Sequence, residues 1–145
     1  MKTVLFVCTG NTCRSPMAQA LFNAKNPKPE QFTAVSAGLY TCDDLPASEN
    51  AIQAMAEMGI DLSHHKSRIL TEEIAAQADY IVCMTAVHYD RLIHAFPAYE
   101  SKIFTIAPHD ISDPFGGNLE TYRACAQELS QAVAGVLQQL TGEKT

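Results

Sequence analysis

A cysteine and an arginine lie close together in a short polar segment near the start of the chain, Cys8 to Ser15. Gly10 and Asn11 between them suit a tight loop, because glycine has wide backbone freedom and asparagine tolerates left-handed geometry. Successive backbone N–H groups of such a loop can point inward at an anion, and the Arg14 guanidinium can bind two phosphate oxygens. The same positive field stabilises a thiolate, and Ser15 can donate to the sulfur. The segment therefore predicts a phosphate-binding loop with Cys8 as nucleophile.

A nucleophile that accepts a phosphoryl group needs an acid to protonate the departing group. Asp113 is the candidate, in the late segment Ser112-Asp113-Pro114-Phe115-Gly116-Gly117. Pro114 stiffens the backbone beside it, and the glycines let the segment fold over the loop. The same pattern is also typical of a plain turn, and Asp110 is the competing acid. We expect Phe115 to line the substrate entrance, with packing as its alternative role.

The composition is that of a folded globular protein, with 47% hydrophobic and 18% charged residues. A length of 145 residues suits one domain, residues 1–145. The formal charge of −6 argues against nucleic-acid binding, because such proteins generally present a basic face. We therefore predict a single globular domain with no nucleic-acid partner.

The cysteine content and the apolar runs indicate the cellular compartment. The opening MKTVLFVCTG has too short an apolar run for a signal peptide, and no run approaches the roughly 18 residues that span a bilayer. Five cysteines are an odd number without secretory context, which favours a reducing compartment and a reactive thiol over disulfides. We expect a cytoplasmic protein without membrane association, and we predict neither a cofactor nor a metal.

Hydrophobic periodicity predicts alternating strands and helices. Strands are predicted at residues 4–7, 32–37, 80–84 and 102–107. Helices are predicted at 17–25 with Ser15 near the cap, from Ser48 to Gly59, from Thr71, at 87–96 and at 119–140. Such alternation indicates an α/β protein with three layers, αβα, around a central four-stranded parallel sheet. Ligands bind these sheets at the carboxyl ends of strands, where Cys8 and the 108–118 loop both lie.

The segment VCTGNTCRSPMA at residues 7–18 and the late Asp113-Pro114-Phe115 resemble the low-molecular-weight protein-tyrosine phosphatases, and the resemblance spans essentially the whole chain. It implies the flavodoxin-like fold of that family and the release of inorganic phosphate from phosphorylated proteins. It also implies that Cys8 forms a phosphocysteine, that Arg14 binds phosphate, and that Asp113 acts first as acid and then as base toward water. The implied phosphate-binding loop comprises Thr9, Gly10, Asn11, Thr12, Cys13, Arg14 and Ser15, and the residues that brace it are Ser36 and His65.

Thr12 bears on the substrate. Family members that act on phosphotyrosine usually carry a larger aliphatic residue at this position, and Thr12 with the 113–117 segment resembles the bacterial branch that dephosphorylates protein arginine. A small residue with a hydroxyl leaves room and polarity for a guanidinium, whereas an aliphatic wall suits an aromatic ring. We expect a preference for phosphoarginine, with phosphotyrosine as the alternative, and we expect Thr12, Tyr40 and Phe115 to set selectivity.

The resemblance further implies that Cys13 forms a disulfide with Cys8 on oxidation, which would protect the nucleophile. The alternative is that Cys13 only fills space. The remaining cysteines, Cys42, Cys83 and Cys125, are expected to be structural.

Other functions fit part of the pattern. A thioredoxin-coupled arsenate reductase shares the fold and loop, but it needs two relay cysteines, and none follows Cys83 within residues 84–122. A zinc site of Cys8, Cys13 and His65 lacks a second tight ligand pair. A phosphate-binding module without turnover would leave Asp113 without a use.

Overall fold

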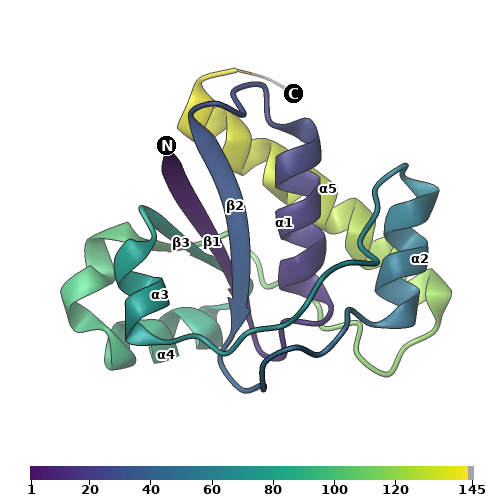
Figure 1. Ribbon diagram of the computed structural model, residues 1–145, viewed down its shortest axis with the longest axis horizontal. Coiled ribbons are helices and arrows are strands. Elements are labelled where there is room, and N and C mark those ends of the chain that lie inside the picture. The colour runs from purple at the N-terminus through teal and green to yellow at the C-terminus, as the bar shows by residue number, and fades with distance from the viewer. Residues whose placement is uncertain (144–145) are drawn as a thin grey trace.

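Four parallel strands form the centre of the fold in the computed structural model, which describes residues 1–143. The strands are β1 (Lys2–Cys8), β2 (Phe32–Gly38), β3 (Tyr80–Cys83) and β4 (Ile103–Thr105), and their order in the sheet is β2-β1-β3-β4. The helices are α1 (Arg14–Lys25), α2 (Glu49–Glu57), α3 (Glu72–Gln77), α4 (Ala86–Ala95) and α5 (Leu119–Thr141). Figure 1 shows the sheet between α3 and α4 on one side and α1 and α5 on the other. The predicted three-layer α/β fold is confirmed.

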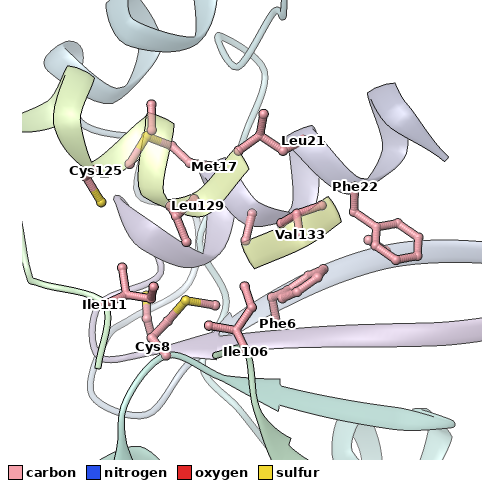
Figure 2. Close-up of a cluster of buried hydrophobic side chains, with 14 of the residues drawn as sticks. Phe6, Cys8, Met17, Leu21, Phe22, Ile106, Ile111, Cys125, Leu129 and Val133 are labelled. Carbon is pink, nitrogen blue, oxygen red and sulfur yellow. The ribbon is translucent and has the colours of Figure 1, made fainter. Parts of the chain in front are cut away.

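The central strand β1 is buried on both faces, which explains its continuous apolar run. Val4 and Phe6 belong to the core under α1 and α5, whereas Leu5 and Val7 belong to the core under α3 and α4. This is the alternation that a strand imposes on neighbouring side chains. Figure 2 shows the first of these cores, in which Phe6 and Cys8 face side chains from α1 and α5. The nucleophile candidate therefore sits at the end of the best-packed strand in the sheet.

Side-chain caps fix where several helices begin. The Ser48 hydroxyl accepts a hydrogen bond from the Ala51 N–H at the start of α2, and Thr71 accepts one from Ile74 at the start of α3. Asn118 caps α5 by accepting from the Thr121 N–H at 3.0 Å. These bonds satisfy N–H groups that have no partner within the helix. The caps predicted at Ser48 and Thr71 are confirmed.

Two predicted element boundaries are wrong. Helix α1 begins at Arg14 rather than Met17, and its N-cap is Cys13. Ser15 lies inside the first turn, where its hydroxyl contacts the Cys8 sulfur instead of capping the helix. The last strand covers only residues 103–105, because a 3₁₀ helix at Pro97–Lys102 occupies the preceding residues. Of the helices within residues 1–143, none has both the length and the apolar character needed to cross a bilayer.

Candidate active site

The Cys8 sulfur is held by two hydrogen-bonding groups at the end of β1. The Asn11 backbone N–H donates to Sγ at 3.3 Å, and the Ser15 hydroxyl lies 2.9 Å from Sγ. Ser15 Oγ also accepts a hydrogen bond from the Asn11 side-chain amide at 2.8 Å, which leaves its own hydrogen free for the sulfur. Asn11 adopts a left-handed backbone with φ of 56°. Two donors therefore converge on the Cys8 sulfur and hold it at the end of β1.

Asn11 also ties this loop to the neighbouring strand and to the chain before α3. Its side-chain amide donates to Ser36 Oγ on β2 at 2.9 Å, and its side-chain oxygen accepts from the Arg68 N–H at 3.0 Å. The Ser36 hydroxyl in turn donates to Gln19 Oε1 at 2.6 Å. The structure thus places Ser36 behind the loop and adds Gln19 and Arg68, which sequence reasoning missed because only the fold brings these segments together.

His65 lies against the same loop. Its Nε2 is 2.7 Å from the Asn11 carbonyl oxygen, which can only accept, so Nε2 carries the hydrogen. Burial lowers the pKa of His65, and the hydrogen bond to Asn11 opposes that effect. The ring therefore positions the loop by donating to its backbone.

The Arg14 guanidinium spans the space between the loop and the segment that carries Asp113. One terminal nitrogen donates to the Ile111 carbonyl at 2.9 Å, and the other lies 3.6 Å from an Asp113 carboxylate oxygen. The Arg14 side chain is 6% exposed, whereas that of Asp113 is 53% exposed. Asp110, the competing acid, instead accepts a hydrogen bond from the Ala86 N–H at 2.9 Å.

A cavity of about 220 Å³ opens above these groups. Its lining residues come from the loop and from the late segment: Cys8, Thr9, Gly10, Thr12, Cys13, Arg14, Asp113 and Phe115. Asn11 and Ser15 lie behind the lining as buried supports. Tyr40 is not part of the wall; it is exposed, and its ring stacks on the Arg91 guanidinium at 4.9 Å from the ring centroid. The cavity brings the predicted nucleophile, arginine and acid together.

Cys13 faces a polar cluster at the side of the cavity. Its sulfur lies 3.2 Å from the Tyr122 hydroxyl, and its thiol donates to Ser48 Oγ at 3.6 Å. Burial, followed by the contact with Cys13, raises the pKa of Tyr122 to about 12, so the phenol is neutral. Cys8 and Cys13 are both free thiols here, and their disulfide stays a prediction. Sequence reasoning had treated Tyr122 as a core residue only, because its helical spacing gave no other signal.

The other cysteines lie apart from this chemistry. Burial raises the pKa of both Cys83 and Cys125 to about 12, and the Cys83 thiol donates to the Phe104 carbonyl at 3.4 Å. Cys42 is exposed. Within residues 1–143, no three His, Cys, Asp or Glu side chains are grouped closely enough to hold a metal, so Cys8, Cys13 and His65 do not form the zinc site considered above.

The geometry fits transfer of a phosphoryl group to sulfur, because one cavity offers a cysteine sulfur, a buried guanidinium for the phosphate oxygens and a carboxyl group for the leaving group. This is the chemistry of the cysteine-dependent protein phosphatases.

Comparison with known families gives the same class. Residues 3–145 match the family model described as low molecular weight phosphotyrosine protein phosphatase. The chain belongs to this family and is a low-molecular-weight protein phosphatase.

The relatives differ in the activity for which they are named. A protein-arginine-phosphatase of Geobacillus stearothermophilus is 37% identical, with 97% of each chain covered. A probable low molecular weight protein-tyrosine-phosphatase, EpsP, of Ralstonia nicotianae is 33% identical, with 92% of each chain covered. Arsenate reductase 1 of Staphylococcus epidermidis is 40% identical over 91% of this chain and 92% of its own.

Solved structures agree with the fold. The YwlE arginine phosphatase from Geobacillus stearothermophilus superposes with a TM-score of 0.91 at 37% identity, covering 98% of this chain and 94% of that one. A cysteine-to-serine mutant of YwlE arginine phosphatase with a phosphorylated active-site serine has a TM-score of 0.89 at 34% identity, covering 97% of each chain.

Proposed function

We propose that this phosphatase acts on phosphorylated protein side chains through a phosphocysteine at Cys8, and that it prefers phosphoarginine. One observation carries the proposal: the Cys8 sulfur, held by Asn11 and Ser15, lies in the same small cavity as Arg14 and Asp113. The relative from Geobacillus stearothermophilus and the YwlE structures, which are named as arginine phosphatases, support the choice of substrate.

The reaction takes place in two balanced steps. The Cys8 thiolate forms an S–P bond as the P–N bond of phosphoarginine breaks, and the Asp113 carboxylic acid gives its proton to the departing guanidine nitrogen. The Asp113 carboxylate then takes a proton from a water molecule, whose oxygen attacks phosphorus. The S–P bond breaks, inorganic phosphate leaves, and the thiolate returns. Arg14 binds the phosphoryl oxygens throughout, and Phe115 lines the entrance.

Two polar side chains in the cavity wall, Thr12 and Asp113, support phosphoarginine. The Thr12 side chain lines the cavity, and its hydroxyl lies 3.8 Å from the Cys13 sulfur. A guanidinium carries several N–H donors, which need acceptors when they leave water. The Thr12 hydroxyl and the Asp113 carboxyl group can supply such acceptors, whereas an aliphatic residue in place of Thr12 would remove one of them.

The arsenate reductase alternative rests on the relative of that name. It requires two further thiols that exchange electrons with the nucleophile, yet Cys83 is fully buried and no other cysteine occurs in residues 84–122. Arsenate-dependent oxidation of reduced thioredoxin by the purified protein would support this alternative.

The substrate test compares matched peptides that differ only in phosphoarginine or phosphotyrosine. We expect the higher kcat/KM for phosphoarginine, and Thr12→Ile should shift the ratio toward phosphotyrosine. Thr33→Ile, on β2 and outside the cavity lining, is the matched control and should leave the ratio unchanged. Equal or faster turnover of phosphotyrosine by the wild type would refute the arginine preference.

The chemistry is tested separately with Cys8→Ser. This change should abolish multiple turnover of both peptides while phosphate binding remains. Phosphate release undiminished in this variant would exclude Cys8 as the nucleophile.

We further propose that the protein acts as one domain in the cytoplasm on protein substrates, without a membrane or nucleic-acid partner. It needs no cofactor, because Cys8, Arg14 and Asp113 together supply the groups that the chemistry needs.

A further inference from the structure

A buried histidine from α4 contacts the phosphate-binding loop without belonging to it. His88 lies in the first turn of α4, and its Nε2 is 2.9 Å from the Thr9 hydroxyl oxygen. The residue is 5% exposed. Its other ring nitrogen, Nδ1, is buried and has no hydrogen-bond partner within residues 1–143. Thr9 itself is exposed at the mouth of the cavity that it helps to line.

The charge state of His88 follows from its surroundings. Burial and the positive charges of Arg14 and Arg91 together lower its pKa to about 4, against the opposing effect of Asp113 and Asp110. The ring is therefore neutral near pH 7 and carries a single N–H. If Nδ1 held that hydrogen, a buried N–H donor would have no acceptor, which is rare in folded proteins. The hydrogen is therefore assigned to Nε2, which donates to Thr9.

This assignment determines what the Thr9 hydroxyl can do. Because Thr9 Oγ1 accepts the bond from His88, its own hydrogen cannot point back at the ring and is available to another acceptor. In the proposed reaction, the cavity that Thr9 lines holds the phosphoryl group beside Arg14, which lines the same cavity. A hydroxyl on that wall adds a side-chain donor to the backbone cradle.

We propose that His88 is a positioning residue that orients the Thr9 hydroxyl as a hydrogen-bond donor to the bound phosphoryl group. The inference rests on the proposed function, because it assigns a phosphoryl group to the cavity. His88 never touches the substrate; it acts through Thr9.

The test is a double-mutant cycle read out as the Kd for inorganic phosphate, measured by calorimetry. Thr9→Val and His88→Leu should each weaken binding by about 10-fold, the size expected for one hydrogen bond to a charged group. His88→Leu should have no further effect in the Thr9→Val background, because both changes remove the same bond. A full effect of His88→Leu in that background would overturn the proposal, as would an unchanged Kd in His88→Leu itself.

Two further variants separate positioning from packing. His88→Gln keeps an N–H donor on a side chain of similar reach and should restore phosphate affinity to within about 3-fold of wild type. Failure of His88→Gln to do so, with the fold retained, would assign His88 a packing role instead. His94→Gln, an exposed position on the same helix, is the matched control.

The tautomer of His88 can be tested by NMR spectroscopy in the wild-type protein. The imidazole ¹⁵N chemical shifts of His88 in the wild-type protein should report hydrogen on Nε2, and hydrogen on Nδ1 would overturn the proposal. Failure of this inference remains distinct from failure of the proposed function: phosphate binding and tautomer are measured without turnover, whereas peptide hydrolysis tests the reaction itself.

Discussion

The two segments that meet at the cavity are built in opposite ways. The loop from Cys8 to Ser15 is tied down, with Asn11 fully buried and bonded to β2 and to the chain before α3. The segment around Asp113 is open, and Phe115 is 77% exposed. A cradle of amides must be formed before a dianion arrives, because reorganising it would reduce the stabilisation of charge. An acid that later activates water benefits from access to solvent.

Ile111 is where the open segment is anchored. Its side chain is buried, its N–H donates to the Met84 carbonyl at 3.0 Å, and its carbonyl accepts from Arg14 at 2.9 Å. The segment is thus held two residues before Asp113 by Arg14, the proposed phosphate ligand. Substitutions in the two segments should therefore separate effects on catalytic activity from effects on the stability of the fold.

Asp113→Asn should give a large effect on activity with a small effect on the fold. Loss of the acid should lower kcat by roughly 100- to 10,000-fold. The side chain is half exposed, so the free energy of unfolding should change by less than about 0.5 kcal/mol. Steady-state kinetics and urea unfolding measure the two quantities. Asp110→Asn is the matched control, and a loss of kcat in that variant but not in Asp113→Asn would exchange the roles of the two aspartates.

Asn11→Ala should, in contrast, have a large effect on the stability of the fold. It removes the side chain that donates to Ser15 and Ser36 and accepts from Arg68, all in a buried setting. We expect a loss of about 3 kcal/mol in the free energy of unfolding, together with weaker phosphate binding. Asn50→Ala loses one hydrogen bond of 3.4 Å and should cost less than about 1 kcal/mol. Equal unfolding midpoints for the two variants would contradict the bracing role of Asn11.

His88 should make the fold sensitive to acid. Its pKa is lowered from 6.5 to about 4 in the folded state, mainly by burial. Between these values the unfolded chain binds the proton more readily than the folded protein does. The contribution of His88 to the free energy of unfolding is therefore complete above pH 6.5 and is lost as pH falls toward 4. We expect His88 to account for about 1 to 3 kcal/mol of the decrease in unfolding free energy over this pH range. Unfolding curves of wild type and His88→Gln between pH 7 and about 4 test it; parallel curves would rule it out.

Phe115→Ala should give the smallest effect. The side chain is exposed, so the change in unfolding free energy should stay below about 0.5 kcal/mol. Because Phe115 lines the cavity, KM for peptide substrates should rise by about 3-fold, in line with the loss of a partly buried aromatic contact. Ile69→Ala, at an exposed apolar position outside the lining of this cavity, should leave KM unchanged. A rise in KM for both variants would indicate a general effect of surface apolar residues.

Much of the fold was predictable because local patterns agree with the final structure. The apolar run of β1, the caps at Ser48 and Thr71 and the stripe of α5 all follow from local rules. The start of α1 was mispredicted, because the Ser15 hydroxyl serves the Cys8 sulfur rather than a helix end. A local rule could not anticipate that use, which depends on how the loop folds back on itself.

The cavity was predictable only in part. Cys8, Arg14 and Asp113 stand out by type and spacing, but Gln19, Arg68, Tyr122 and His88 give no such signal. Arg68, Tyr122 and His88 each reach the loop from a different segment, and His88 lies 79 positions from the residue it contacts. Gln19 instead bonds to Ser36, which in turn accepts from Asn11 of the loop. Tyr40 lies outside the lining of the cavity, stacked on Arg91, and its expected part in selectivity stays a prediction.

By itself, the sequence determined the layered α/β fold and the identity of the anion-binding loop, because hydrophobic periodicity and loop composition are local properties of the chain. Tertiary structure decided which side chains hold that loop in place and which acid faces it. Those partners meet only when the parallel strands align their carboxyl ends at one edge, and hydrogen bonds between distant segments depend on that alignment.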